Sequence, residues 1–266
     1  MFKNFLRDSI GFTFANIFIK ALNLILIPLY VRFLSFEDYG IFELVSTLTI
    51  IFVVVVSLEV TQSILRFVAD QSSSKELQSQ YIKNGLHVIF ISSIIFISII
   101  YIFSSSISEI LFETNEYNKV IEITAWIISF QCINYSISVI HRSQKRFYFA
   151  IRHSIIVAIL SGTFALTFLI ISSGSLTALL KGLTLGGSIA ALIGLFNFRK
   201  DIFFATDLLV AKKMLLFSIP LVFSSIAIHL ASFADRIIIN DLLTLEALAT
   251  YGIAAKVGSL ITILIA

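Results

Sequence analysis

Long apolar runs separated by short polar connections dominate the sequence. A membrane-spanning helix needs about 20 predominantly apolar residues, and eight runs are long enough: roughly 10–34, 40–67, 82–108, 120–140, 148–171, 176–196, 215–239 and 247–266. The connections are short, as expected for antiparallel neighbours, and the two longest polar ones are 69–80 and 197–213. The pattern predicts an all-α polytopic membrane protein with about eight transmembrane helices.

The composition also indicates that lipid, rather than water, surrounds most of this chain. Of its 266 residues, 58% are hydrophobic and only 13% are charged, whereas a soluble domain carries about 25% charged residues. The net charge of +3 is too small to indicate a nucleic-acid partner. The single cysteine, Cys132, excludes an internal disulfide and gives no metal-ligand spacing, and we expect no cofactor.

Lysine and arginine are distributed unevenly between the two sides of the predicted bundle. If the N-terminus is cytoplasmic, thirteen of them fall on the cytoplasmic side and only four outside: Arg32, Lys119, Lys181 and Arg236. Cytoplasmic connections carry the excess of positive charge in membrane proteins, so we expect a cytoplasmic N-terminus. The first apolar run is longer than the apolar region of a signal peptide, and no small-residue cleavage site follows it. We therefore expect a retained first helix.

A short motif occurs twice, each time at the start of a predicted helix. Tyr39-Gly40-Ile41 and Tyr251-Gly252-Ile253 are 212 residues apart, with six spans between their starts. Because six is even, both copies enter the membrane in the same direction, as in a parallel repeat; chance similarity of two apolar hairpins is the alternative. A repeat predicts a six-helix bundle at 1–200, a cytoplasmic linker at 201–214 and the start of a second bundle at 215–266. We would then expect the chain to be part of a longer protein.

Polar residues within the predicted spans fall on helix faces. Asn16, Lys20 and Asn23 are spaced four and three residues apart and share one stripe of the first span. Gln131 and Asn134 form a similar face in the fourth span. Neutral polar residues often tie membrane helices together by hydrogen bonds, whereas an ionisable residue at membrane depth usually faces a cavity or a partner. Lys20 is therefore the strongest candidate for a functional charge.

Other ionisable residues also lie within the predicted spans. Arg236 follows Asp235, which could simply pair with a neighbour at the outer end. Glu59 and Arg66, seven residues apart, either bridge to other helices or gate the cytoplasmic mouth. His229 has a side chain that titrates near neutral pH, and it is either a proton carrier or a hydrogen-bonding core residue.

Several chemical motifs are missing from the sequence. It contains no phosphate-cradling glycine-rich loop, no histidine–cysteine metal spacing and no nucleophile elbow. The connections are too short to hold a catalytic or nucleotide-binding domain. If the protein uses energy, the source would therefore be an ion gradient or the membrane potential.

The segment from Ile27 to Asp70 resembles the N-terminal hallmark of bacterial polysaccharide-biosynthesis flippases, which translocate O-antigen and capsule repeats. In that family the first helix ends in a P-L-x-x-R-x-L-x-x-x-x-Y-G run, matched here by Pro28, Leu29, Arg32, Leu34, Tyr39 and Gly40. The second helix ends in R-[FY]-x-A, matched by Arg66, Phe67 and Ala69. The family's second half has similar residues in register with Ser218-Ile219-Pro220, Asp235-Arg236 and Tyr251-Gly252. The chain departs from the family at Leu58-Glu59, where a leucine–glycine pair is usual.

The resemblance implies two six-helix bundles around a central cavity that opens alternately to each side of a bacterial inner membrane. The implied cargo is an undecaprenyl-diphosphate-linked oligosaccharide, with membrane lipid, a glycan polymerase and export machinery as further partners. We expect the diphosphate to be compensated by Lys20 and Arg236, with Lys256 as a further candidate. We expect the sugars to bind Asn16, Asn23, Gln131 and Asn134. Gating or ion pairing is expected of Arg32, Glu59, Arg66, Asp235 and His229.

The main alternative is a cation-coupled multidrug or metabolite exporter of the same superfamily of multidrug, oligosaccharidyl-lipid and polysaccharide exporters. Such an exporter would want an acidic residue deep in the first span or its neighbours, and the first span has none between Ile10 and Arg32. A membrane glycan polymerase usually carries a large external loop with paired arginine or histidine, which this chain lacks. A purely structural membrane protein would leave Lys20 unexplained.

Overall fold

The computed structural model describes the backbone of residues 2–70, 74–198 and 207–265. It describes the side chains of residues 11, 13–70, 74–198 and 207–258. Regular structure in these ranges is helical throughout, with bounds α1 Phe2–Phe33, α2 Phe36–Ser57, α3 Val60–Asp70, α4 Lys75–Phe112, α5 Asn118–Ser143, α6 Phe147–Ile171, α7 Leu176–Phe196, α9 Leu208–Leu242 and α10 Leu245–Ile265.

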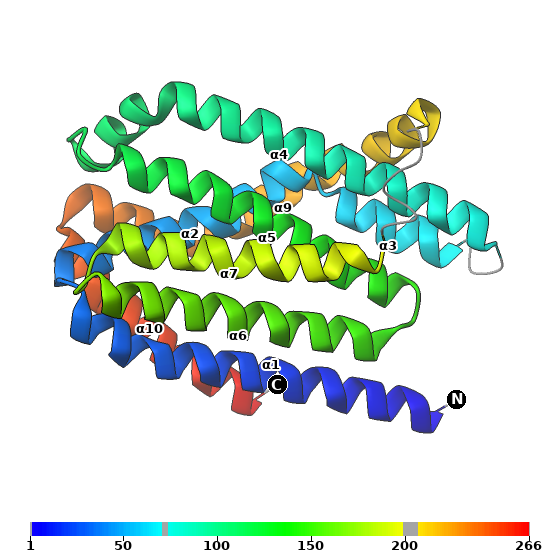
Figure 1. Cartoon of the computed structure of the whole chain (residues 1–266), viewed down its shortest axis with the longest axis horizontal. Coiled ribbons are helices and arrows are strands. Elements are labelled where there is room, and N and C mark those ends of the chain that lie inside the picture. The colour runs from blue at the N-terminus through cyan, green and yellow to red at the C-terminus, as the bar shows by residue number, and fades with distance from the viewer. Residues whose placement is uncertain (1, 71–73, 199–206, 266) are drawn as a thin grey trace.

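The helices lie side by side along the long axis of the molecule (Figure 1). Among the described residues, α2, α4, α5, α6, α7, α9 and the part of α1 from Thr13 to Phe33 are long and apolar enough to cross a membrane. The prediction of an all-α polytopic membrane protein is confirmed. The eighth predicted span, 247–266, falls on α10, and side chains of its last eight residues lie outside the described part of the chain.

The helices alternate in direction. In Figure 1, α1 and α9 begin at one end of the bundle, and α2 and α10 begin at the opposite end. We call these the α1-start end and the α2-start end. The two copies of the Tyr-Gly-Ile motif, which lie near the starts of α2 and α10, therefore enter the bundle in the same direction.

The second predicted span, 40–67, is not a single helix. Leu58 and Glu59 both have left-handed backbone conformations, with φ of 49° and 50°, so α2 ends at Ser57 and α3 begins at Val60. The break is stabilised locally, because the Leu58 N–H donates to the carbonyl of Val55 at 3.2 Å and the Glu59 N–H donates to the Ser57 hydroxyl at 3.3 Å. By itself α2 is long enough to cross a membrane, and α3 is a separate short helix that follows it.

Polar caps make several helices longer than the apolar runs suggest. The helix α4 covers 38 residues rather than 82–108, because the Ser74 side chain accepts from the Leu77 N–H at its start. Asp207 caps α9 in the same way and accepts from Leu209 and Val210, so this helix starts before the predicted 215. Helix caps of this kind contribute about 1 kcal/mol each. The predicted linker at 201–214 lies outside the described residues up to 206, and its remainder belongs to the cap and first turns of α9.

The charged stretch between the first two spans is a helix start. Ser35 accepts from the Asp38 N–H at 3.0 Å, and Glu37 and Asp38 occupy the first turn of α2. Carboxylates at a helix N-terminus are stabilised by its unpaired N–H groups and its dipole. The charges Glu37 and Asp38 are thus accounted for by helix capping.

Glycine allows the helices to approach closely at two interfaces. In the α6–α7 pair, a Cβ at Gly182 would lie 2.4 Å from the Phe164 carbonyl oxygen, and one at Gly186 would lie 2.5 Å from that of Leu160. This Gly-x-x-x-Gly spacing is typical of tightly packed membrane helices. In the α2–α10 pair, a Cβ at Gly40 would lie 2.0 Å from the backbone oxygen of Leu245. These contacts bring α7 close against α6 and α10 close against α2.

Candidate functional site

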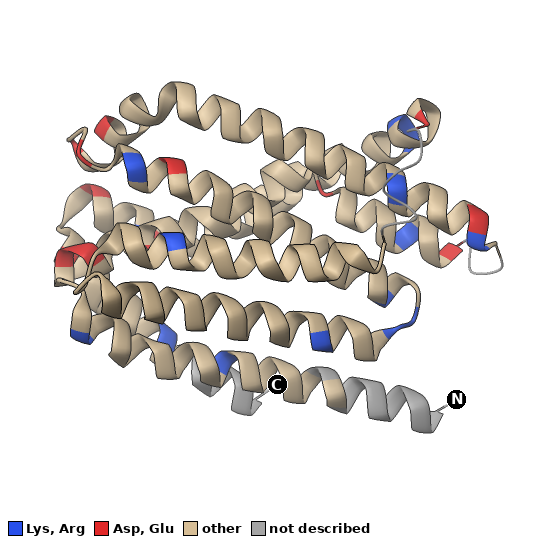
Figure 2. Ribbon diagram, viewed as in Figure 1, with Lys and Arg blue, Asp and Glu red and all other residues tan. Residues whose placement is uncertain are grey.

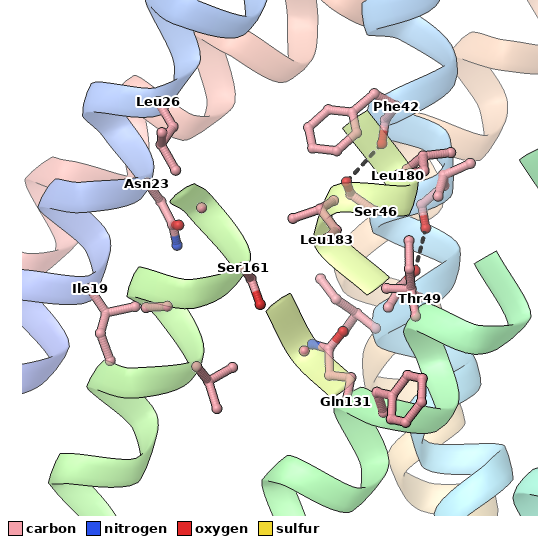
Figure 3. Close-up of a pocket in the computed structure, with 18 of the residues that line it drawn as sticks. Ile19, Asn23, Leu26, Phe42, Ser46, Thr49, Gln131, Ser161, Leu180 and Leu183 are labelled. Carbon is pink, nitrogen blue, oxygen red and sulfur yellow. Dashed lines mark hydrogen bonds between the residues drawn. The ribbon is translucent and has the colours of Figure 1, made fainter. Parts of the chain in front are cut away.

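A cavity of about 490 Å³ lies between α1, α2, α5, α6 and α7, with Lys256 of α10 at its edge. Most of its wall is apolar, formed by residues such as Ile19, Leu26, Leu180 and Leu183 (Figure 3). Five of these helices, all except α7, supply its polar side chains: Asn23, Tyr30, Ser46, Thr49, Gln131, Asn134, Ser154, Ser161 and Lys256. A cavity of this size and lining is typical of a site for an organic molecule rather than an ion alone.

Three of the predicted sugar-binding residues line the cavity: Asn23, Gln131 and Asn134. In Figure 3, Asn23 and Gln131 extend from α1 and α5 into the space between the helices, near Ser161 of α6. Their amide groups can both donate and accept hydrogen bonds. The polar stripes predicted on these two helices therefore converge in part on one space.

The Asn134 amide is held in place by neighbouring helices. Its Nδ2 donates to the Gly187 carbonyl of α7 at 2.9 Å, and its Oδ1 lies 3.1 Å from Nε2 of the buried His153 on α6. Because Oδ1 can only accept, His153 carries its proton on Nε2 in this contact. Asn134 is therefore a fixed part of the wall, whereas Gln131 is exposed.

The hydroxyl groups of α2 bond to their own helix. Ser46 and Thr49 donate to the carbonyls of Phe42 and Val45, each at 2.7 Å. Each hydroxyl oxygen still has lone pairs with which to accept from a ligand hydroxyl. This side of the cavity can thus accept hydrogen bonds without losing its internal ones.

Four of the other predicted residues lie away from the cavity lining. Lys20 and Asn16 are exposed on α1, although Ile19 beside Lys20 belongs to the wall. Arg236 of α9 places its guanidinium 5.0 Å from the Phe233 ring. His229, also on α9, is half-buried. The substrate-binding role of Lys20, Asn16 and Arg236 stays a prediction.

Asp235 has a partner on the neighbouring helix. Its carboxylate accepts a hydrogen bond from the Tyr251 hydroxyl of α10 and one from the Arg236 backbone N–H at 2.9 Å. The contact joins α9 to the second copy of the Tyr-Gly-Ile motif. It also fits the expectation that Asp235 pairs with a neighbour at the end of the span.

Glu59 and Arg66 do not share a partner. Arg66 is exposed on α3, with its guanidinium 4.6 Å from the ring of Phe217 on α9. Glu59 is buried and contacts the Thr61 hydroxyl at 3.5 Å, and no cation of the described part of the chain pairs with it. Arg32 is exposed in the last turn of α1. The gating role of these residues stays a prediction.

A buried ion pair beside the cavity was not predicted. Glu43 of α2 is 1% exposed and accepts from the ammonium group of Lys256 on α10. The sequence shows Glu43 only as one of several charges near a helix start. Its burial and its partner, which is 213 residues away, appear only in the fold.

Most charged residues lie towards the two ends of the bundle, and the acidic ones are concentrated at the α2-start end (Figure 2). At this end the Tyr117 hydroxyl donates to Glu37 at 3.2 Å and links the start of α5 to that of α2. Burial and the Glu37 carboxylate raise the pKa of Tyr117 to about 12. The described residues contain no group of histidine, cysteine, aspartate or glutamate suited to a metal ion.

Comparison with known proteins assigns the family. A model of the family described as "Polysaccharide biosynthesis protein" matches residues 5–266, which is nearly the whole chain. No curated protein matches the chain, and no solved structure does. The chain is therefore a polytopic membrane protein that belongs to the polysaccharide biosynthesis protein family.

Proposed function

We propose that this protein is a flippase that moves an undecaprenyl-diphosphate-linked oligosaccharide across the bacterial inner membrane by alternating access. The observation that carries the proposal is the cavity lined by amides and hydroxyls within a bundle of membrane-spanning helices. Membership in a polysaccharide biosynthesis family supports a glycan as the cargo. We propose a transporter rather than an enzyme.

The chemistry of the cavity suits a lipid-linked sugar. Sugar hydroxyls both donate and accept hydrogen bonds, as do the exposed amides of Asn23 and Gln131 and the hydroxyls of Ser46, Thr49 and Ser161. The prenyl chain needs no polar path and can stay in the lipid. The headgroup crosses a hydrocarbon layer of about 30 Å, so it alone needs such a site.

The diphosphate needs a compensating cation during the crossing. Lys256 lies at the edge of the cavity, and we keep Lys20 and Arg236 as the further proposed cations. In this scheme the N-terminus is cytoplasmic, the α2-start end faces outward, and a glycan polymerase and export machinery receive the cargo there.

Deletion of the complete gene in its own host tests the proposal. We expect surface polysaccharide to fall and full-length lipid-linked repeat units to accumulate on the cytoplasmic face. Single repeat units that have already reached the outer face would indicate a glycan polymerase instead. Unchanged glycans would contradict the proposal.

A cation-coupled exporter is the second candidate, and two buried carboxylates favour it. The first span has no acidic residue at depth, but the neighbouring α2 carries Glu43, and Glu59 lies buried just after it. Buried carboxylates are common in proton and sodium pathways. Normal glycans together with increased drug sensitivity in the deletion strain would favour this candidate.

A further inference from the structure

The two residues of the Glu43–Lys256 ion pair differ in their exposure. The Glu43 side chain is 2% exposed, whereas that of Lys256 is 33% exposed and borders the cavity. The lysine therefore faces the space that a ligand would enter, and the carboxylate lies closed off behind it. Glu43 is the seventh residue after the start of α2 at Phe36, which places the pair about 10 Å along the helix.

Two aromatic rings lie beside the ammonium group of Lys256. It lies 5.5 Å from the centre of the Tyr39 ring and 5.4 Å from that of Phe42, and it is 3.5 Å from the Tyr39 hydroxyl. Aromatic faces attract cations through their negative quadrupole. The site therefore retains attraction for the ammonium group even without its carboxylate partner.

The backbone leaves room for this arrangement. A Cβ at Gly252 would lie 2.6 Å from the Glu43 carboxyl carbon, so a larger residue there would displace the carboxylate from its present position. Gly252 belongs to the second copy of the Tyr-Gly-Ile motif, and Tyr39 to the first. The pair thus sits where the two copies of the motif meet.

Stability alone does not explain why an ion pair is present at this position. Burying two charges costs several kcal/mol, and a well-packed apolar pair is often as stable or more so. Removing one partner is much more costly, because the other charge stays buried without compensation. A ligand that takes over one partner must therefore bring its own charge.

We infer that Lys256 is the group that recognises the diphosphate and that Glu43 is the resident counter-ion, which is exchanged for the substrate. The inference rests on the proposed function. A phosphate that enters the cavity meets the exposed side of the ammonium group and replaces the carboxylate as its partner. The Tyr39 hydroxyl, one helical turn before Glu43, is placed to donate to the released carboxylate.

The exchange couples binding to the packing of two helices. Glu43 lies on α2 and Lys256 on α10, and these helices pack directly against each other. When Lys256 turns to the ligand, the charge that joins α2 to α10 is lost. Substrate binding therefore loosens this contact in the proposed transport cycle.

The test measures the affinity of the purified full-length protein for farnesyl diphosphate, a short polyprenyl diphosphate, with farnesol as the uncharged control. We expect Lys256→Gln to weaken diphosphate binding by about tenfold or more, and Glu43→Gln to strengthen it by about tenfold, because the competing carboxylate is gone. Lys181→Gln, at an exposed lysine of α7, serves as the matched control and leaves the affinity unchanged. Farnesol binds all variants equally.

A charge swap, Glu43→Lys with Lys256→Glu, separates recognition from structure. It restores the ion pair and should unfold at a higher temperature than either single variant, but it turns a carboxylate toward the cavity and should lose diphosphate binding. Full binding by the swapped protein, or weaker binding by Glu43→Gln, would show a purely structural pair and overturn the inference. A wild-type protein that binds the diphosphate no better than farnesol would contradict the proposed function itself.

Discussion

At the scale of single residues, the clearest strain lies at the break between α2 and α3. Glu59 has φ of 50°, a conformation that costs a residue with a side chain about 1 kcal/mol and glycine little. We expect Glu59→Gly to be about 1 kcal/mol more stable than Glu59→Ala, because both lack the buried carboxylate but only glycine relieves the backbone. Thermal unfolding in detergent checks the difference. Equal stability would show that the break is not strained.

Lys20 can be tested in the same way. We expect Lys20→Ala to abolish glycan export while inserting into the membrane normally, because removal of a charge from a span makes insertion easier. Surface polysaccharide and membrane abundance are measured in a deletion strain carrying the variant, with Lys181→Ala as the control. Normal export would show that Lys20, which is exposed on α1, has no role in substrate binding.

Part of the cavity lining could be predicted from the positions of single residues in the sequence. Helical periodicity grouped Gln131 with Asn134, and both line the cavity. It also grouped Asn23 with Asn16 and Lys20, and of these three only Asn23 lines it. Periodicity gives the face of a helix but not its neighbour. The bond from Asn134 to Gly187 and the pairing of Glu43 with Lys256 both cross between helices that are distant in sequence.

At the scale of helices, close packing of α6 and α7 depends on glycine. We expect Gly186→Ala to destabilise the protein by about 1–3 kcal/mol, because its Cβ would overlap the backbone of α6 near Leu160. Gly187→Ala is the matched control on the same helix, since its Cβ would meet its nearest neighbour at an ordinary 3.7 Å. The unfolding temperatures of the two variants test this prediction. Similar values would show that α6 and α7 can move apart to accept the added Cβ without loss of stability.

The helices themselves follow from apolar run length, but their ends and breaks do not. Ser74 and Asp207 extend α4 and α9 beyond the apolar runs, because capping acts on the backbone rather than through hydropathy. The break at Leu58 and Glu59 carries no glycine or proline. The local hydrogen bonds from Leu58 to Val55 and from Glu59 to Ser57 stabilise it, and hydropathy does not report such bonds.

At the scale of the whole molecule, the direction of the helices gives a test of topology. Cys132 is buried, so a Cys132→Ser background lets single cysteines report exposure. We expect a membrane-impermeant thiol reagent on intact cells to label Glu116→Cys, which lies in the connection at the α2-start end. Lys145→Cys, in the connection at the opposite end, should react only after the cells are opened. The reverse pattern would place the N-terminus outside.

The central claim is that the molecule moves a lipid-linked oligosaccharide between leaflets. Its most direct test reconstitutes the purified full-length protein into liposomes that carry a fluorescent undecaprenyl-diphosphate oligosaccharide in both leaflets, and follows access of a membrane-impermeant quencher. We predict that nearly all of the fluorescence becomes accessible with the wild-type protein, and that only the outer half does with Lys256→Gln or in protein-free liposomes. Quenching confined to the outer leaflet with correctly folded wild-type protein would contradict the account.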